Sequence, residues 1–299
     1  MTGSTMSLGQ HELRLFLRQR LALPILLLTA LLSIASVWAG MAEVARQNNT
    51  IARIQPQQAS DVAAIAKWAS KEGNAGEAAY YTFHATWDAP SPLAFAAIGQ
   101  RDVAPYILRV RALGLEAQLY ESENYNAELA LPGRFDWAFV LTYLAPLFVI
   151  VLLHDLKSGE REAGRIGLLA AMARNERALW RRRIGWRLGL LLAALLIPFV
   201  IGAVLSGAGA FAIMSFAIVA VAYLLFWAVL CLWVGSRDWS SVTNAATLAA
   251  SWLVLTLILP ALANLAINAA IPVRQGVELT LEQREKIHGG WDKPRAETM

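Results

Sequence analysis

Five long apolar stretches constrain this chain more than any other feature of its sequence. They cover residues 21–41, 136–154, 188–205, 210–234 and 245–271, and each holds few or no charged residues. A helix needs about 20 mostly apolar residues to cross a bilayer. With 57% hydrophobic and 16% charged residues, the chain is also too apolar for a soluble domain of this length. We therefore expect a mainly α fold, a polytopic α-helical membrane protein with five visible spans.

The two ends of the chain each allow two interpretations. The first stretch is longer than the apolar part of a usual signal peptide and follows twenty residues with a helical pattern of their own, so we expect a retained anchor. Five spans place residues 272–299 on the side opposite the N-terminus. We expect this tail to be truncated before a further span, and a natural five-span protein with a short external tail is the alternative.

Positive charge predicts the orientation. Residues at one set of span ends include Arg14, Arg18 and Arg20, nine Lys or Arg between 155 and 187, and Arg237, whereas the flanks of the opposite loop offer only Arg46, Arg53 and Arg134. Since cytoplasmic loops are enriched in Lys and Arg, we expect a cytoplasmic N-terminus. The arginines beside the spans also suit anionic lipid headgroups, and the rest of the chain is nearly balanced in charge, so membrane lipid is an expected partner and nucleic acid is not.

Residues 42–135 form a connection too long for a simple loop and are expected to fold as a small α+β outer domain between spans 1 and 2. We expect a helix that is capped at Ser60 and Asp61 and ends near Gly73, a strand over 79–86, a turn over 87–92, and either a strand or a short helix over 107–115. His84 is the only histidine of this segment and has no cysteine beside it, so no metal site is predicted.

The predicted cytoplasmic elements are an interface helix over 1–20 and a helical loop over 155–187. Ser158 is a candidate N-cap, Glu160 lies in the first helical turn, and Ile166, Leu168, Leu169 and Met172 give the helix a face to pack. A second helix is expected from Asn175 through the run Arg181 to Arg183, which we interpret mainly as a membrane anchor. From physical chemistry alone, partner docking and simple helix capping explain residues 160–164 equally well.

The residues 135–140 (FDWAFV), 144–147 (LAPL) and 155–164 (DLKSGEREAG) resemble the permeases of ABC-2 type transporters, in particular the DUF3526-like branch with a large outer loop after the first span. In that family, the second span ends in a Glu-Arg-Glu-x-Gly motif, which Glu160, Arg161, Glu162 and Gly164 match. Arg165 departs from the threonine that often follows. Residues 90–95 and 99–103 are similar to the same branch, and residues 288–292 look like the start of a further outer segment.

The resemblance implies a multi-pass permease of the bacterial inner membrane that pairs with a second permease copy or a related permease. It also implies contact with a separate ABC ATP-binding subunit, which would bind ATP and Mg. The coupling residues would be Ser158, Glu160, Arg161, Glu162, Gly164, Ile166, Leu168 and Leu169. No phosphate-binding loop occurs in the sequence, so we expect no catalytic site, cofactor or metal in this chain.

We therefore expect a permease subunit of an exporter that couples ATP hydrolysis in its partner to translocation. Two alternatives stay open. One is an ion-coupled secondary transporter, which would need ionisable residues inside its spans. The other is a non-transport membrane protein whose outer domain senses or assembles something.

Overall fold

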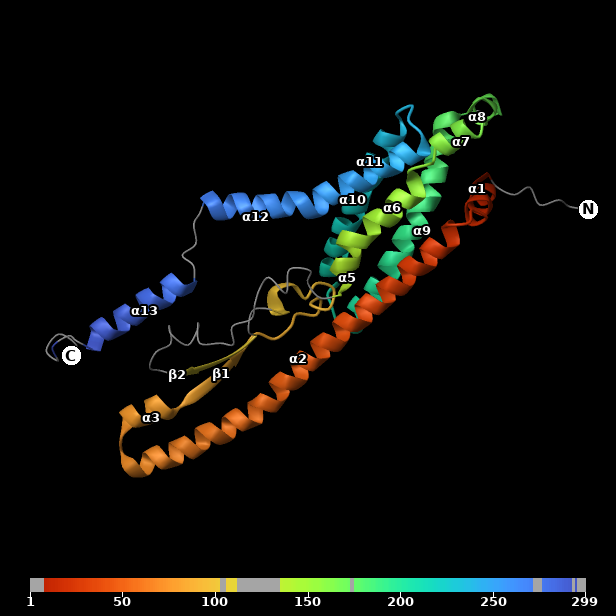
Figure 1. Cartoon of the computed structure of the whole chain (residues 1–299). Helices are drawn as coiled ribbons and strands as arrows, with labels where there is room; N and C mark the ends of the chain where they lie inside the picture. Colours follow the sequence, from red (N-terminus) through yellow and green to blue (C-terminus); the bar gives the residue numbers. More distant parts are fainter. Residues whose placement is uncertain are drawn as a thin grey trace, which may run out of the picture. The chain divides into compact units, whose positions relative to one another are not determined.

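The computed structural model describes residues 8–102, 106–111, 135–172, 175–270, 276–291 and 294 (Figure 1). The described part is mostly helical. It contains five helices that are long and apolar enough to cross a membrane, which confirms the prediction of a polytopic helical protein. The chain divides into two compact units, residues 1–249 and 250–299.

The first unit begins with α1 (Leu8–Leu17) and the long helix α2 (Ala22–Glu72). The apolar residues of the first predicted span form only the first part of α2, which continues without interruption for 51 residues. The helix ends where the sequence predicts, because Gly73 adopts a left-handed φ of 68° and its N–H bonds Ala69 O. The predicted helix start at Ser60 and Asp61 is wrong. The Asp61 carboxylate instead accepts a bond from Gln57 Nε2 of the preceding turn, at 2.9 Å.

The second span consists of α5 (Trp137–Phe139), the π-helical turn η3 (Val140–Leu144) and α6 (Ala145–Leu153). The π turn directly precedes Pro146, which lacks the N–H that would bond the carbonyl of Thr142. The Tyr223 hydroxyl donates to that carbonyl at 2.9 Å. A side chain from another span thus satisfies the backbone group that the proline leaves without its helical partner.

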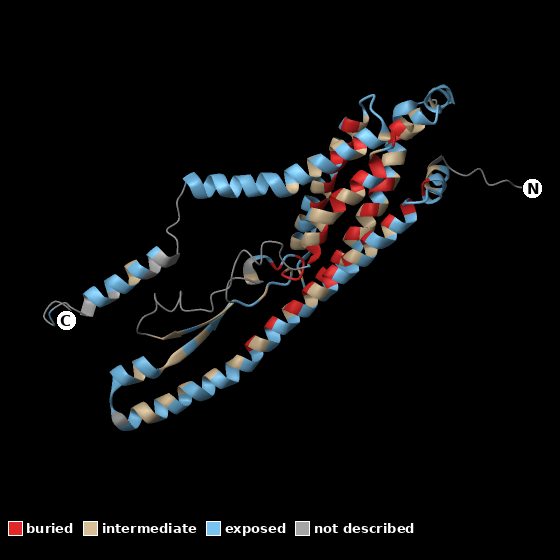
Figure 2. Ribbon diagram, viewed as in Figure 1, coloured by how far each residue is buried: buried red, intermediate tan, exposed pale blue. Residues whose placement is uncertain are grey.

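The third and fourth spans are α9 (Glu176–Leu205) and α10 (Ala210–Gly235), and α11 (Ser241–Leu253) begins the fifth. Helix α9 ends at the last residue of the third predicted stretch, and α10 covers the fourth stretch and one residue more. Helix α9 starts twelve residues before the third predicted apolar stretch, so the second cytoplasmic helix and the span are one helix. Buried residues lie on the facing sides of these helices (Figure 2). Near the last turns of α9, the ring of Phe199 stacks on that of Trp137 from α5, with centroids 4.4 Å apart.

A short turn over residues 91–98 is packed into this core. Phe95, Ala96 and Ile98 are buried, and Ala138 N–H bonds Ala96 O at 2.8 Å. The turn approaches α2 so closely that a Cβ at Gly40 would lie 2.0 Å from Phe95 O. Glycine at this position is therefore what allows the turn to enter.

Between α2 and α5 the structure describes α3 (Ala75–Tyr81) and an antiparallel hairpin of β1 (Phe83–Trp87) and β2 (Ile107–Arg111). The hairpin register pairs Phe83 with Arg111 and Trp87 with Ile107. The strand expected over 79–86 therefore starts later, because α3 takes its first residues. Of the two options for 107–115, the strand is formed over 107–111, and residues 112–115 lie outside the described part.

The second unit contains the end of the fifth span, with the π-helical turn η4 (Val254–Ile258) and α12 (Leu259–Ala270), followed by α13 (Gly276–Trp291). The η4 turn precedes Pro260 as η3 precedes Pro146, and the missing proline N–H explains both. The span runs from Ser241 to Ala270, close to the predicted 245–271. Residues 288–291 of the expected further segment end α13, and Asp292 lies outside the described residues.

Candidate coupling site

The loop between the second and third spans folds as two short helices, α7 (Ser158–Glu162) and α8 (Ile166–Met172). The single helix expected from Ser158 to Met172 is therefore wrong. Gly164 adopts a φ of 69°, Gly164 N–H bonds Arg161 O, and Arg165 N–H bonds Glu160 O, both at 2.9 Å. These two bonds are those of a Schellman motif, which ends α7 at the glycine. The last glycine of the family-like motif thus acts as a helix stop.

Ser158 is buried and is not the N-cap that the sequence suggests. Helix α7 starts directly after the turn that ends α6, with Gly159 N–H bonded to Asp155 O at 2.8 Å, so the chain is already helical there. The Ser158 hydroxyl donates to His154 O at 3.4 Å and accepts from the Ser241 hydroxyl at 2.9 Å. It therefore joins α7 to α6 and to the start of α11.

Glu160 is the centre of an ion-pair cluster. Its carboxylate binds Arg165 at 2.7 Å and Arg183 of α9 at 2.9 Å. Arg183 also binds Glu12 of α1 at 3.0 Å. The three side chains of the Glu12, Glu160 and Arg183 set are only 11%, 18% and 12% exposed, so water screens their attraction weakly. The cluster connects α1, α7 and α9.

Arg187 lies one turn further along α9 and is buried. Its guanidinium donates to Leu152 O, the last turn of α6, and lies 3.6 Å from the Asp155 carboxylate. It also lies over the ring of Phe16 in α1, 5.7 Å from the ring centroid. Arg187 therefore bonds the second and third spans to each other at the end where α7 begins.

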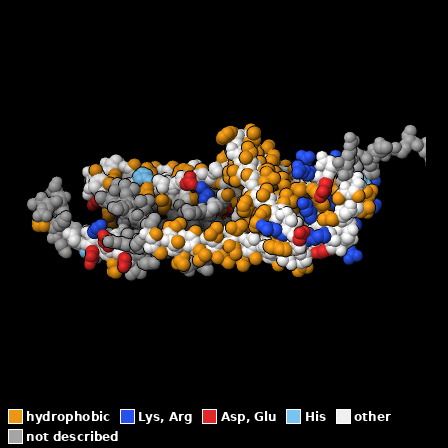
Figure 3. Space-filling model, turned by 90° about the horizontal axis from the view of Figure 1, so that it is seen from above, with side chains coloured by type: hydrophobic (Ala, Val, Ile, Leu, Met, Phe, Trp, Pro, Cys, Tyr) orange, Lys and Arg blue, Asp and Glu red, His pale blue; other side chains and the backbone are white. Residues whose placement is uncertain are grey.

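Arg161 and Glu162 point to a different neighbour, the connection between α10 and α11. Arg161 binds the Asp238 carboxylate at 3.0 Å and donates to Trp239 O. The Glu162 carboxylate accepts from Ser241 N–H at 2.6 Å and from the Ser241 hydroxyl at 3.1 Å. The three charged residues of the motif thus contact α9 and the α10–α11 connection at the same end of the first unit, where Figure 3 shows blue and red side chains intermixed.

The apolar residues of α8 lie mostly at the surface. Ile166, Leu168 and Met172 are 37%, 60% and 77% exposed, and Leu169 is half-buried. The expected packing face is therefore not covered by the part of the chain that the structure describes. A cavity of about 340 Å³ separates α8 from α1 and α9, and Leu168 and Leu169 line it together with Glu160, Arg165 and Arg183.

All eight residues of the expected coupling set lie on α7, α8 or the turn between them. Ser158, Glu160, Arg161 and Glu162 are joined to other elements, whereas Ile166 and Leu168 are left exposed. Sequence reasoning missed Glu12, Arg187 and Ser241. The interpretation of residues 181–183 as a membrane anchor does not extend to Arg183, because it is paired with two carboxylates, while Arg181 and Arg182 are exposed.

No group of three or more His, Cys, Asp or Glu side chains that could hold a metal ion occurs within the described residues. Comparisons with models of protein families, with characterised proteins and with solved structures found no match. The geometry of the α7–α8 region and the sequence pattern therefore carry the functional interpretation.

Proposed function

We propose that this chain is the membrane permease subunit of an ATP-driven, ABC-2 type transporter, an exporter of the bacterial inner membrane with a cytoplasmic N-terminus. One observation carries the proposal. The short helices between the second and third spans are bonded to α9 and to the α10–α11 connection, yet α8 leaves apolar side chains exposed. An element that receives force from a separate protein needs both properties.

The two helices divide these roles in the proposal. Helix α7 transmits movement, because its charged side chains and Ser158 connect it to the end of α6, to α9, and to the α10–α11 connection with the start of α11. Helix α8 docks the ATP-binding subunit, because an interface core is built from apolar side chains such as Leu168 and Met172. Arg165, which is 58% exposed and bound to Glu160, lies between the two helices at the edge of that surface.

ATP and Mg would be bound by the partner, since the sequence has no phosphate-binding loop. In the proposal, two ATP-binding subunits act on two permease copies, or on this chain and a related permease. Closure of the ATPase pair moves α7 and α8 and shifts the spans between two arrangements. Because Glu162 holds the start of α11, the fifth span moves with the second and third.

Docking is tested by substitutions on α8. Charge reversal at Glu160 or Glu162 would be a poor test, since both carboxylates are bonded within the chain. Leu168→Glu and Met172→Glu place a charge on exposed side chains instead. The matched control is Leu281→Glu in α13, where the leucine is 56% exposed against 60% for Leu168.

The measurement is a detergent pull-down of the tagged chain expressed with its genomic neighbours. We expect the unmodified chain and Leu281→Glu to retain an ATP-binding protein and both α8 variants to lose it. If the unmodified chain retains none, the proposal fails, and a membrane protein without a transport role becomes the better explanation. Equal retention by all four forms would place the docking surface elsewhere and remove the observation on which the proposal rests.

A further inference from the structure

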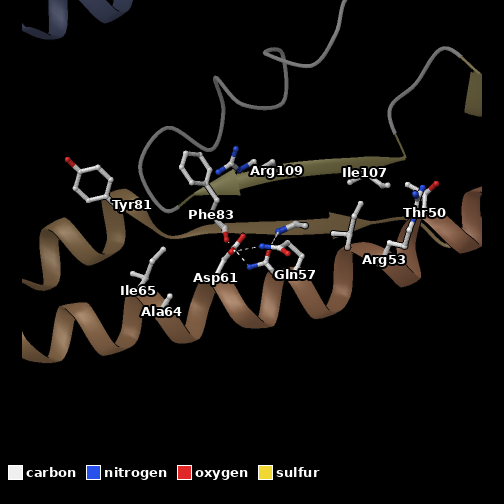
Figure 4. A pocket seen from close by; sticks show the side chains of 13 residues that line it. Thr50, Arg53, Gln57, Asp61, Ala64, Ile65, Tyr81, Phe83, Ile107 and Arg109 are labelled. Carbon is white, nitrogen blue, oxygen red and sulfur yellow. Dashed lines mark hydrogen bonds between the residues drawn. The ribbon is translucent and has the colours of Figure 1, made fainter.

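A groove lies between the second half of α2 and the hairpin of β1 and β2, far along α2 from the coupling site (Figure 4). Its volume is about 800 Å³, within the range of about 300–1,000 Å³ that is usual for ligand sites. Residues 50–65 of α2 form one wall over about 22 Å of helix, at 1.5 Å per residue. Tyr81, Phe83, Ala85, Ile107 and Arg109 form the other wall.

The two walls are held together by one side chain, Gln58. Its Nε2 donates to Phe83 O at 2.8 Å, and its Oε1 accepts from Ala85 N–H at 2.7 Å. The amide group thus bonds β1 in the way that a neighbouring strand would. These bonds fix the distance between helix and hairpin, so the groove is a built feature of the fold.

The lining combines apolar side chains with unequal charge. Ile54 and Ile65 come from α2, and Ile107 comes from β2. Arg53 is exposed and forms no ion pair with any residue that the structure describes. Arg109 is also exposed, with its guanidinium 3.9 Å from the ring centroid of Phe83. Among the described lining residues, Asp61 carries the one carboxylate, and it already accepts a hydrogen bond from Gln57.

From this arrangement we infer that the groove binds an amphipathic anion, a molecule with one carboxylate or similar group and an apolar chain. The anionic group lies beside Arg53, about 12 Å along α2 from the repelling Asp61 carboxylate. The apolar chain of the ligand covers the isoleucines and the rings of Tyr81 and Phe83. Tyr81 is 55% exposed in the absence of a ligand, so an apolar chain there removes surface from water.

The ligand comes from solution rather than from the bilayer leaflet. The apolar part of α2 ends near Met41, and Thr50, the first lining residue, lies about 14 Å further along the helix. The polar headgroup layer extends only about 5–8 Å beyond the hydrocarbon core. A lipid that stays in the bilayer therefore does not reach the groove.

The test uses the full chain in lipid nanodiscs and dodecanoic acid carrying a diazirine, with the labelled peptides identified by mass spectrometry. We expect labelling of residues 50–65 and of the hairpin. The double variant Arg53→Gln, Arg109→Gln should label about tenfold less, the loss expected when a charge-assisted bond worth about 1.4 kcal/mol is removed. The matched control is Lys67→Gln, Lys71→Gln, which also removes two positive charges from the chain but lies outside the groove.

Two further probes identify the ligand class and its source. A diazirine derivative of dodecylamine should not label the groove, and an anionic phospholipid with a diazirine, built into the nanodisc, should label only the spans. The inference is overturned if the amine labels the groove as well as the acid does, if only the phospholipid labels it, or if the arginine variant labels like its control. The experiment needs no ATP-binding subunit, so its outcome is separate from that of the transport proposal.

Discussion

The Glu162 carboxylate binds both the backbone N–H and the hydroxyl of Ser241, the first residue of α11. The first N–H groups of a helix have no partner within it and carry partial positive charge, so a carboxylate stabilises them. Glu162 therefore supplies a second capping acceptor from another part of the chain, beside the Ser240 hydroxyl that accepts from Thr243 N–H. The fifth span begins on a side chain of the loop that joins the second and third.

Removing this cap should loosen the start of α11. For Glu162→Ala we expect a loss of about 1 kcal/mol, the usual cost of losing a capping oxygen. Amide hydrogen exchange should become faster at Ser241, whose N–H loses its acceptor, than at Thr243, whose N–H keeps its bond to the Ser240 hydroxyl. Glu285→Ala in α13, where the glutamate is exposed, is the control and should leave those amides unchanged. Unchanged exchange in Glu162→Ala would show that Glu162 does not support the helix.

The Arg183 variant should be the most harmful in the ion-pair cluster. Arg183→Gln leaves the carboxylates of Glu12 and Glu160 close together in a poorly solvated place, and we expect a loss of about 3 kcal/mol. Arg182→Gln removes the same charge at an exposed neighbouring position and should cost less than about 0.5 kcal/mol. Thermal unfolding in detergent measures both. Similar unfolding midpoints for the two variants would show that Arg183 does not stabilise the chain through its pairing with Glu12 and Glu160.

The turn over residues 91–98 should depend on Gly40. In Gly40→Ala the new methyl group would overlap the Phe95 carbonyl, and we expect a cost of about 1–3 kcal/mol as the turn is displaced. Gly189→Ala in α9 is the control, because no atom lies within 4 Å of its added Cβ. Alanine favours a helix over glycine by about 1 kcal/mol, so this control should be neutral or stabilising. Limited proteolysis at the turn reports the displacement directly.

The hairpin should separate from α2 when Gln58 is replaced. Gln58→Leu keeps the bulk of the side chain and loses both bonds to β1, each worth about 1 kcal/mol. We expect faster amide exchange in residues 83–87 and 107–111, with little change in the spans. Gln55→Leu replaces an exposed glutamine nearby and should not alter exchange. Equal exchange in both variants would rule out the holding role of Gln58.

The spans could be predicted from the sequence because a bilayer demands long runs of apolar residues, and such runs need no knowledge of distant contacts. Gly73 could also be predicted as a helix end, because glycine ends a helix through its own local conformation. The start of α2 gave no sign that the helix would continue through Ser60 and Asp61. Ser60 and Asp61 favour a helix start only where the residues before them are not helical. Here the preceding turns of α2 are already helical.

The contacts of the coupling site, by contrast, could not be predicted from the sequence. The pattern at residues 158–164 drew attention to this loop, but the residues that its charges join lie far away in sequence, at Glu12, Arg183 and Ser241. A carboxylate in a helical turn has the same local pattern whether it binds water, another helix or a separate protein. The sequence signal for the ion-pair cluster was Glu12, because it is an acidic residue in a basic helix and that helix faces a basic loop.

The unbroken course of α2 has a mechanical consequence. Its 51 residues span about 77 Å, and about 46 Å of that length extends beyond Met41. Because the helix is a stiff rod, a tilt of about 10° in its apolar half would swing its far end through about 8 Å. Small rotations of α2 where it packs against α1 and α9 would therefore produce larger displacements at the hairpin.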